Sequence, residues 1–531
     1  MSQPTPQTLI PGAPDQGAPP EIAGLTLPDL LERSAARHGR RPAITQRERV
    51  VDYAEYAARA HALAHHLLGL GLAPGDRVGL LMDKTPEALI AFMGVAAAGG
   101  VVFPMDFNQP PDVLQYVLSF TSPSALVADE RFQDLLGRLK PPFAPECVVV
   151  NGGAVRPGFT AWERATTRGP SRRPAVALSP AGPVYLNFTS GTTGQPKGAV
   201  TTHLNLLYNT LGAVRALELR EDDVHLCMFP VVAHPHELLA RPLFLGGEAA
   251  LAESIHPGHL ARLVAARKVT AMMAVASIYH TLARASESGG GDLSSLRLAE
   301  SGGMHVPPEL ARRFRERFCA AIVPVWGSTE TTGVALAAPL DGSAPAGSMG
   351  RPVPFYEVKV LGEDGEELGP EAVGELAVGG PGVCRSYFNN PAETAKNLRG
   401  GWFISGDLVR RDREGFFHFV DRKARMMKVG GLKVFCAEIE AALRAHPGVE
   451  EVAVVRIADP AHGEMPKAVI VPVAGREPEA KALRHFLDGR LARYKHPRVF
   501  EFRAALPRNS AGKIHLRALE DDEEGREDPR P

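Results

Sequence analysis

Residues 189–198 read TSGTTGQPKG and directly follow the apolar stretch 184–188, VYLNF. The apolar stretch predicts a strand, and the glycines after it let the backbone curl so that its N–H groups converge. Hydroxyl groups add donors and Lys197 adds a positive charge, which together suit a polyphosphate. The spacing is not the GxxxxGK[ST] of the Walker loop, so the Walker geometry does not apply. The alternative interpretation is a flexible Ser/Thr/Gly surface loop.

Around this loop, short runs rich in valine and isoleucine alternate with longer amphipathic stretches from about residue 28 to residue 420. This alternation is typical of βαβ units on a parallel sheet. The predicted strands in this part are 76–81, 101–103, 148–150, 184–188 and 320–325, with a helix at 86–98. Between 350 and 420 the pattern changes to strands separated by glycine turns, which predicts an antiparallel or barrel-like subdomain. Those strands are 357–361, 374–378 and 416–420.

A charged stretch, 421–425, precedes a compact final unit. Its predicted elements are a helix at 437–446, strands at 451–457 and 467–473, a helix at 478–492 and a strand at 499–503. We therefore predict an α/β protein with a large N-terminal domain of parallel sheets flanked by helices, a barrel-like antiparallel subdomain, and a small α+β C-terminal domain. The predicted division is a flexible tail at 1–24, the N-terminal domain at 25–421, the C-terminal domain at 422–519 and an acidic tail at 520–531.

Composition excludes several classes of protein. The 531 residues are 44% hydrophobic and 22% charged, as in a globular protein of several domains. A net charge of -1 gives no field for nucleic acid. The five cysteines never form CxxC, which predicts free thiols in a reducing cytoplasm and neither a disulfide framework nor a zinc site. No secretory signal is seen, and Gly99, Gly100 and Pro104 interrupt the uncharged stretch 88–105, so no membrane span is expected.

Taken with the motifs that follow it, the loop at 189–198 resembles the phosphate loop of the adenylate-forming superfamily. That superfamily includes acyl-CoA synthetases, adenylation domains of nonribosomal peptide synthetases and beetle luciferase, and the similar motifs span roughly residues 28–515. The resemblance implies ATP-dependent activation of a carboxylic acid to acyl-AMP, then thioester formation with coenzyme A. It implies that the loop residues that bind ATP are Thr189, Ser190, Gly191, Thr192, Thr193, Gly194 and Lys197.

Two further motifs of the large domain extend the resemblance. The segment 326–330, WGSTE, implies nucleotide binding by Trp326, Gly327 and Thr329, with Thr329 at the α-phosphate and Glu330 as the Mg²⁺ ligand. A single glutamate is consistent with a cation that takes only one or two carboxylates from protein. The segment 403–407, FISGD, implies that Asp407 accepts hydrogen bonds from both ribose hydroxyls.

Near the C-terminal domain, Arg422 is implied to lie near the ribose, although 421–425 alone reads as a solvated charged linker. The segment 428–433, KVGGLK, resembles the loop that lines the pantetheine tunnel and implies contacts from Lys428, Gly430 and Gly431. The segment 507–513, PRNSAGK, resembles the catalytic loop, in which Lys513 bridges the carboxylate and the α-phosphate. The resemblance also implies that the C-terminal domain is mobile and rotates between the two steps.

Two positions depart from the family pattern. Ala424 stands where the family usually has aspartate or lysine, so control of the hinge can differ. Cys436 stands where relatives commonly have proline, and we interpret it as a packed thiol because no base lies near it in sequence.

Acyl specificity is predicted by position alone. The segment 229–237, FPVVAHPHE, resembles the one that carries a gating histidine, and His234 is favoured over His236 for that role. The stretches 275–279 and 301–304 are expected to line the rest of the pocket, and Gly303 is assigned to cofactor binding. Relatives that activate amino acids place an aspartate here to pair with the substrate amine, whereas the nearest positions of this chain are valine and alanine, which argues against α-amino acids. Whether the acid is aryl or aliphatic stays open.

Three alternatives concern the reaction as a whole. The adenylate can be passed to a carrier protein or to an amine instead of coenzyme A. Only about eighteen residues follow Lys513, so a carrier would be a separate protein. A non-catalytic homologue is disfavoured because Lys197, Glu330, Asp407 and Lys513 are all present. The oligomeric state is not predicted, and a homodimer is left open.

Overall fold

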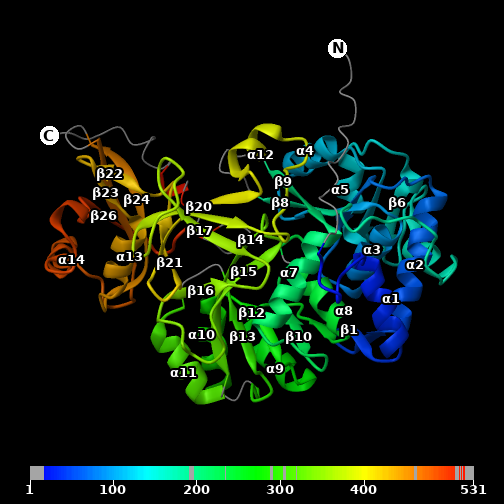
Figure 1. The fold of residues 1–531 in the computed structure, drawn as a ribbon, viewed down its shortest axis with the longest axis horizontal. Coiled ribbons are helices and arrows are strands. Elements are labelled where there is room, and N and C mark those ends of the chain that lie inside the picture. The colour runs from blue at the N-terminus through cyan, green and yellow to red at the C-terminus, as the bar shows by residue number, and fades with distance from the viewer. Residues whose placement is uncertain are drawn as a thin grey trace, which may run out of the picture. The chain divides into compact units, whose positions relative to one another are not determined.

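The computed structural model describes residues 17–189, 196–233, 235–287, 291–302, 306–318, 320–459, 463–508, 514, 516 and 518–520. By its internal contacts the chain divides into two units, drawn in Figure 1. The larger unit contains residues 1–358 and 377–404, and the smaller unit contains residues 359–376 and 405–531. This division follows packing, whereas the predicted boundary at 421/422 follows the chain and stays a prediction.

The first sheet of the larger unit has seven strands in the order β7-β6-β5-β3-β4-β8-β9. Its strands are β3 (Arg77–Leu81), β4 (Val101–Pro104), β5 (Ala125–Asp129), β6 (Val148–Asn151), β7 (Thr160–Ala161), β8 (Pro183–Thr189) and β9 (Lys197–Thr202). All neighbours are parallel except β8 and β9, which form an antiparallel pair. Val78, Val102 and Val127 are fully buried, as expected for parallel strands covered on both faces.

The second sheet of the larger unit is parallel in its middle and antiparallel at its ends. Its strand order in this unit is β16-β15-β14-β13-β12-β10-β11-β1-β2. The strands are β1 (Pro42–Gln46), β2 (Arg49–Asp52), β10 (Val224–Cys227), β11 (Glu248–Leu251), β12 (Ala271–Ala274), β13 (Leu298–Ser301), β14 (Ala321–Ser328), β15 (Gly333–Ala337) and β16 (Ser348–Pro352).

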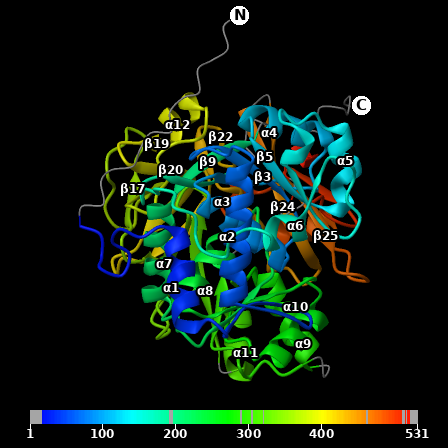
Figure 2. The same ribbon diagram turned by 90° about the vertical axis from the view of Figure 1, so that its right-hand side faces the viewer.

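The helices of the larger unit pack on these sheets. They are α1 (Leu27–His38), α2 (Tyr53–Gly69), α3 (Pro86–Ala97), α4 (Pro111–Thr121), α5 (Gln133–Arg138), α6 (Trp162–Thr167), α7 (His203–Ala216), α8 (Arg241–Leu245), α9 (Pro257–Arg267), α10 (Ala276–Glu287), α11 (Pro308–Phe318) and α12 (Pro391–Asn397). Figure 2 shows α1, α2 and α3 close together, and α3 is buried along its whole length because Glu87 is its only charged residue. Ile22 is also fully buried in this core.

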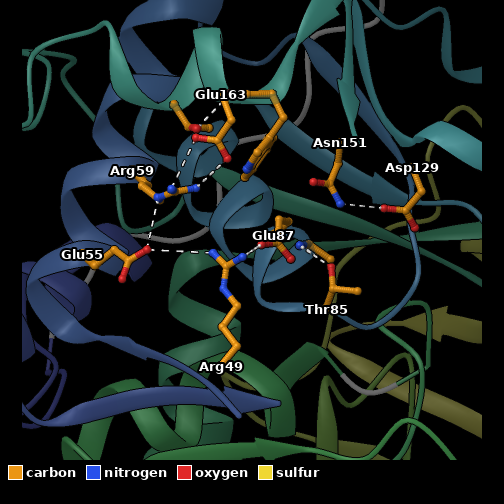
Figure 3. Close-up of polar contacts among 11 residues, drawn as sticks. Arg49, Glu55, Arg59, Thr85, Glu87, Asp129, Asn151 and Glu163 are labelled. Atoms are coloured by element: carbon orange, nitrogen blue, oxygen red, sulfur yellow. Dashed lines mark hydrogen bonds and ion pairs between the residues drawn. The ribbon is translucent and has the colours of Figure 1, made fainter. Parts of the chain in front are cut away.

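Ion pairs on the surface connect β2 with α2, α3 and α6 (Figure 3). Arg49 Nη1 lies 2.7 Å from Glu87 Oε1 and Arg49 Nη2 lies 3.8 Å from Glu55 Oε1. Arg59 Nε lies 3.2 Å from Glu55 Oε1, and Arg59 Nη1 lies 3.3 Å from Glu163 Oε1. Because exposed pairs such as Arg59–Glu163 each contribute only about 0–1 kcal/mol, they orient the helices while the apolar core supplies most of the stability.

The smaller unit is built around a sheet in the order β23-β22-β25-β24, with β26 paired to β25. Its elements are β22 (Met427–Val429), β23 (Leu432–Val434), α13 (Cys436–Arg444), β24 (Val449–Asp459), β25 (Gly463–Pro472), α14 (Ala480–Leu487) and β26 (Val499–Phe502). β21 (Phe417–Arg422) also belongs to it. Three strands have residues in both units: β17 (Glu357–Leu361), β18 (Val373–Gly379) and β20 (Trp402–Arg411). The short strand β19 (Leu398–Arg399) pairs with β20. Ile439, Leu443, Leu483 and Leu487 form the fully buried helix-to-sheet contact.

The predicted fold class is confirmed, including the uncharged stretch at 88–105, which divides into α3 and β4. No helix in the described part of the chain has the length and apolar character needed to cross a bilayer. The predicted helix at 478–492 is wrong in its second half. α14 ends at Leu487, and Gly489 has a φ of +77°, the left-handed conformation in which helices commonly end.

Gly94→Ala is expected to lower the melting temperature. A Cβ on Gly94 in α3 would lie 2.8 Å from Leu63 Cδ2 and 2.9 Å from the Ala60 carbonyl oxygen in α2. Relieving such overpacking costs typically about 1–3 kcal/mol. The control is Gly69→Ala at the end of α2, where no atom lies within 4 Å of the new Cβ. Thermal unfolding of both variants by circular dichroism checks the prediction, and an equal melting temperature for the two would contradict it.

Candidate functional site

The predicted phosphate loop joins the two strands of the β8–β9 hairpin. Thr189, the last residue of β8, pairs with Lys197, the first residue of β9. Lys197 Nζ forms a close ion pair with Glu393 of α12, and its side chain is 11% exposed. The hydrogen bond from Lys197 lowers the pKa of the Glu393 carboxyl. Ser190, Gly191, Thr192, Thr193 and Gly194 lie outside the described residues.

The turn between β14 and β15 contains the predicted 326–330 segment. A register shift between Trp326 and Gly327 marks a bulge at the end of β14. A Cβ on Gly327 would lie 2.2 Å from the Gly333 carbonyl oxygen, so only glycine fits where the two backbones meet. Trp326 and Thr329 are half-buried, and Glu330 is 9% exposed. The bulge therefore turns the chain so that Thr329 and Glu330 come directly after the strand end.

Buried polar groups fix this turn. The backbone N–H of Ser328 donates to Thr331 Oγ1 at 2.8 Å, and the Thr331 hydroxyl lies 2.7 Å from the Gly333 carbonyl oxygen. The Tyr356 hydroxyl donates to the Thr331 carbonyl oxygen at 2.6 Å. Asn209 of α7 donates to Tyr356 Oη and to the Val334 carbonyl oxygen, each at 2.9 Å. Because buried polar groups need partners, this network holds the turn in one conformation.

Tyr387 connects the turn with the hairpin. Its hydroxyl donates to Glu330 Oε1 at 2.7 Å, and Lys197 Nζ lies 6.0 Å from its ring centroid. Burial, with the Glu330 carboxylate next to the hydroxyl, raises the pKa of Tyr387, so the phenol stays a donor. Lys197 and Glu330, which are 133 residues apart in the sequence, thus share one aromatic neighbour. The structure brings together two of the predicted site residues through one that the sequence did not indicate.

The segment that carries Tyr387 lies along the outer strand of the first sheet. The Val200 N–H donates to the Ser386 carbonyl oxygen at 3.0 Å, and the Phe388 N–H donates to the Gly198 carbonyl oxygen at 2.7 Å. The Cys384 N–H donates to the Glu330 carbonyl oxygen at 2.8 Å. No local sequence signal predicts this placement, because every one of these contacts is between residues far apart in the chain.

In the smaller unit, Asp407 and Arg422 are register partners on β20 and β21. Arg422 Nε lies 2.6 Å from Asp407 Oδ1, and their side chains are 57% and 2% exposed, respectively. The neighbouring Asp421 is fully buried and accepts from the Ala437 N–H at the start of α13 at 3.0 Å. The exposed guanidinium of Arg422 and the carboxylate of Asp407 can therefore both form charged hydrogen bonds with a polar ligand.

Gly430 and Gly431 form the two-residue connection of the β22–β23 hairpin. Their φ angles are +56° and +83°, and such positive values at both positions favour glycine. Lys428 is exposed, and its N–H donates to Glu464 Oε2 at 2.8 Å. The hairpin therefore presents backbone without side chains at its tip. Lys513, the predicted catalytic lysine, lies outside the described residues.

The predicted acyl segment leads into a helical turn with π-type hydrogen bonding, His236–Ala240, which continues as α8. Such turns are frequent at functional sites. Glu237 in this turn is 3% exposed. Burial raises its pKa to about 8, the Glu300 carboxylate adds to the rise, and Arg241 opposes it. His234 and Gly303 lie outside the described residues.

Cys436, predicted as a packed thiol, is 2% exposed. Burial raises its pKa to about 12, and its Sγ lies 3.1 Å from the Arg425 carbonyl oxygen. A thiol with such a pKa is not a nucleophile near neutral pH.

Comparisons with known proteins cover nearly the whole chain. The family model described as AMP-binding enzyme matches residues 31–388, and the model described as AMP-binding enzyme C-terminal domain matches residues 438–513. A feruloyl-CoA synthase from Amycolatopsis sp is 34% identical over 91% of this chain and 94% of its own. An indoleacetate–CoA ligase from Aromatoleum aromaticum is 31% identical over 92% of this chain and 96% of its own.

A solved structure is similar over the same extent. The anthranilate CoA ligase AuaEII in complex with anthranoyl-AMP aligns with a TM-score of 0.85 and 25% identity, covering 94% of this chain and 97% of that protein.

Glu237→Gln is expected to change how stability depends on pH. The folded-state pKa of about 8 lies above the ordinary glutamate value of 4.5, so the protonated carboxyl is favoured by folding. Its contribution is fully present below about pH 4.5 and is lost as the pH rises to about 8. The wild-type melting temperature should therefore fall relative to that of Glu237→Gln between pH 5 and pH 9. Differential scanning fluorimetry measures the difference, with Glu146→Gln at an exposed site as control. A difference that is constant with pH would show that Glu237 does not titrate in this range.

Proposed function

The chain belongs to the AMP-binding enzyme family of the adenylate-forming superfamily, and from this membership we propose that its acid is aromatic and that its smaller unit binds the phosphates of coenzyme A. The enzyme is an AMP-forming acid–thiol ligase. It activates a carboxylic acid with ATP as acyl-AMP, releasing pyrophosphate, and then transfers the acyl group to coenzyme A with release of AMP. The near full-length match to CoA ligases is the observation that carries this function.

Two observations support an aromatic acid. Feruloyl, indoleacetate and anthranilate are the acids named for the three similar proteins above, and each has an aromatic ring. The predicted acyl segment and its neighbours supply apolar surface, since Tyr279 and Met272 are fully or almost fully buried and Phe229 packs on the same core. Flat apolar surface next to a few fixed polar groups is typical of pockets for such ligands.

We assign the nucleotide to the residues grouped around Tyr387 in the larger unit. Lys197 supplies positive charge for the phosphates, and Glu330 supplies the carboxylate oxygen that a hard divalent cation such as Mg²⁺ prefers. The residues fit this cation, because Glu330 is fixed by a neutral donor and its second oxygen makes no hydrogen bond to any residue that the structure describes. When bound, Mg²⁺ would neutralise the phosphate charge and leave the positioning of the acid to the protein.

The site for the coenzyme A phosphates is a basic pocket of about 350 Å³ in the smaller unit. It is lined by Val429, Met465, Arg484, Arg493, Tyr494, His496, Pro497 and Arg498. The early end of α14 creates it, because the chain after Leu487 leaves the helix and residues 493–498 reach the pocket as a loop. Val429 belongs to the β22–β23 hairpin, which the resemblance assigns to the pantetheine tunnel.

The charges of this pocket are largely uncompensated. Arg484 Nη2 donates to the Arg498 carbonyl oxygen at 2.6 Å, which fixes both residues without neutralising either. Arg498 Nη1 lies 3.7 Å from Asp459 Oδ2, and within the described residues Arg484 and Arg493 form no ion pair with a carboxylate. Arginine forks match phosphate geometry, and Tyr494, 38% exposed, offers a ring for stacking on adenine. This pocket favours coenzyme A as the acceptor, because a carrier protein or a simple amine carries no free nucleotide to bind there.

Arg493→Ala and Arg498→Ala are expected to raise KM for coenzyme A by about tenfold, because a hydrogen bond to a charged group contributes roughly 1.5–3 kcal/mol. The acid-dependent exchange of pyrophosphate into ATP, which needs no thiol, should keep its wild-type rate. Thioester formation measured at varied coenzyme A separates the two steps.

The matched control is Arg413→Ala at an exposed position of the same unit, which should leave KM for coenzyme A unchanged. If no variant changes that KM, the pocket is not the coenzyme A site. If the wild type exchanges pyrophosphate with aromatic acids but never acylates coenzyme A, a carrier protein or an amine is the acceptor.

Lys513→Ala is expected to slow pyrophosphate exchange by roughly a hundredfold or more, as loss of a fixed group that stabilises transition-state charge does in other enzymes. Thioester formation from supplied acyl-AMP should be spared, because the carboxylate and the α-phosphate that Lys513 is predicted to bridge are already joined in acyl-AMP. Equal loss in both assays would contradict the assignment of Lys513 to adenylation alone.

A further inference from the structure

Two of the segments that the sequence predicts as the lining of the acyl pocket meet the residue before the third at one buried group of polar side chains. Glu237 and Tyr279 come from the two segments, and Glu300 directly precedes the third. The Tyr279 hydroxyl donates to the Glu300 carbonyl oxygen at 2.6 Å, one residue before Ser301. Arg241 lies one turn after Glu237, and Glu237 interacts electrostatically with both Arg241 and Glu300. Glu237 lies in the π-type turn and Arg241 begins α8. Tyr279 lies on α10, and Glu300 lies on β13.

Arg241 carries hydrogen-bond donors that its ion pair does not use. Its Nη1 donates to both oxygens of Glu300, at 2.8 and 3.1 Å, and the two side chains are 1% and 2% exposed. Its Nε and Nη2 find no acceptor among the described residues, and neither does the hydroxyl of Ser301, which is 1% exposed. A buried donor without a partner costs about 1–3 kcal/mol. Arg241 Nε and Nη2 are therefore available to an acceptor that the described chain does not supply.

We propose that Arg241 is a specificity-determining residue, whose Nε and Nη2 bind an oxygen atom of the acid substrate remote from the carboxyl group that is activated. The activated carboxyl group has to meet the phosphates held near Lys197 and Glu330. Within the described residues the hydrogen bonds of Arg241 are with Glu300 and not with Lys197, Glu330 or Tyr387, so we ascribe an oxygen bound at Arg241 to the other end of the acid. This inference rests on the proposed function, because it requires an acid bound by these segments.

The charges around Arg241 select a neutral oxygen over a carboxylate. Glu300 already neutralises Arg241, and Glu237 adds a second acidic group to the same buried space. The other cation, Lys84, is 7% exposed and is held by the Met228 carbonyl oxygen, 2.5 Å from its Nζ. Because Arg241 is already paired with Glu300, a further buried carboxylate would find this cation neutralised, and an unpaired buried charge is costly. The substrate class is thus an aromatic acid with a hydroxyl or alkoxy group far from its carboxyl group.

The test compares three acids of one skeleton by pyrophosphate exchange: 3-phenylpropenoic acid, its para-hydroxy form and its para-methoxy form. The wild type is expected to show a kcat/KM at least about tenfold higher for one oxygenated acid, since a hydrogen bond to a charged group is worth roughly 1.5–3 kcal/mol. In Arg241→Met/Glu300→Leu the ratio should fall to about one. Changing both partners avoids leaving a lone buried charge, a replacement that is often tolerated.

Three further measurements keep the result unambiguous. Arg241→Lys keeps the positive charge but loses the planar set of N–H donors. Its ratio should therefore lie between those of the wild type and the double variant. This variant still tests the proposal if the double variant does not fold. Ser301→Ala should leave the ratio unchanged, because Glu300 and Ser301 are consecutive in β13 and their side chains point to opposite faces of the sheet. Arg312→Met, at an exposed arginine of α11, is the control and should keep the wild-type ratio.

Equal kcat/KM values of the wild type for all three acids would overturn the inference and leave the proposed function standing. So would a preference for the para-carboxy form of the same acid, measured as a fourth substrate, over both oxygenated acids, or a preference that persists in the variants. Absence of pyrophosphate exchange with every acid offered would instead contradict the proposed function itself.

Discussion

The candidate nucleotide site of the larger unit depends on one hydrogen bond, from Tyr387 to Glu330. Glu330 stands at a turn between two strands, where a carboxylate would ordinarily face solvent in many rotamers. The tyrosine donor and the burial of the turn restrict it to one orientation, and the same ring faces the ammonium group of Lys197. Two motifs that are remote in the chain are thereby fixed against each other before any ligand binds. Such preorganised charge is what an enzyme that brings two anions together requires.

The parts of the fold that could be predicted are the helices and strands whose sequence signal lies in neighbouring residues. The short runs rich in valine and isoleucine, the longer stretches between them and the glycine turns placed β3, β4, α3 and most strands of the smaller unit. The Gly430-Gly431 pair likewise marks a tight connection that the structure shows as a hairpin. The error at α14 has a local cause as well. Apolar residues continue to Leu491 with helical spacing, but Gly489 ends the helix, and that choice was not visible in the periodicity.

The site was predictable only in part, because motifs identify residues and not their neighbours. Lys197, Glu330 and Asp407 were found through the resemblance, and their roles stay predictions. Tyr387, Glu393 and the Arg241–Glu300 pair were missed, since each acts through a residue at least 57 positions away in the chain. Single-sequence patterns carry no signal for such pairs. Lys513 and His234, which carry the two predicted catalytic roles, lie outside the described residues.

The segment that holds Tyr387 has a second effect, through its backbone. By bonding to Gly198 and Val200 it occupies the free hydrogen-bonding side of β9, the last strand of the seven-stranded sheet. An uncovered outer strand is a template on which another polypeptide can add as an extra strand. Detachment of this segment would therefore release Glu330 and, in the same event, expose a surface for self-association. In this enzyme, loss of activity on heating and the onset of aggregation should consequently be coupled.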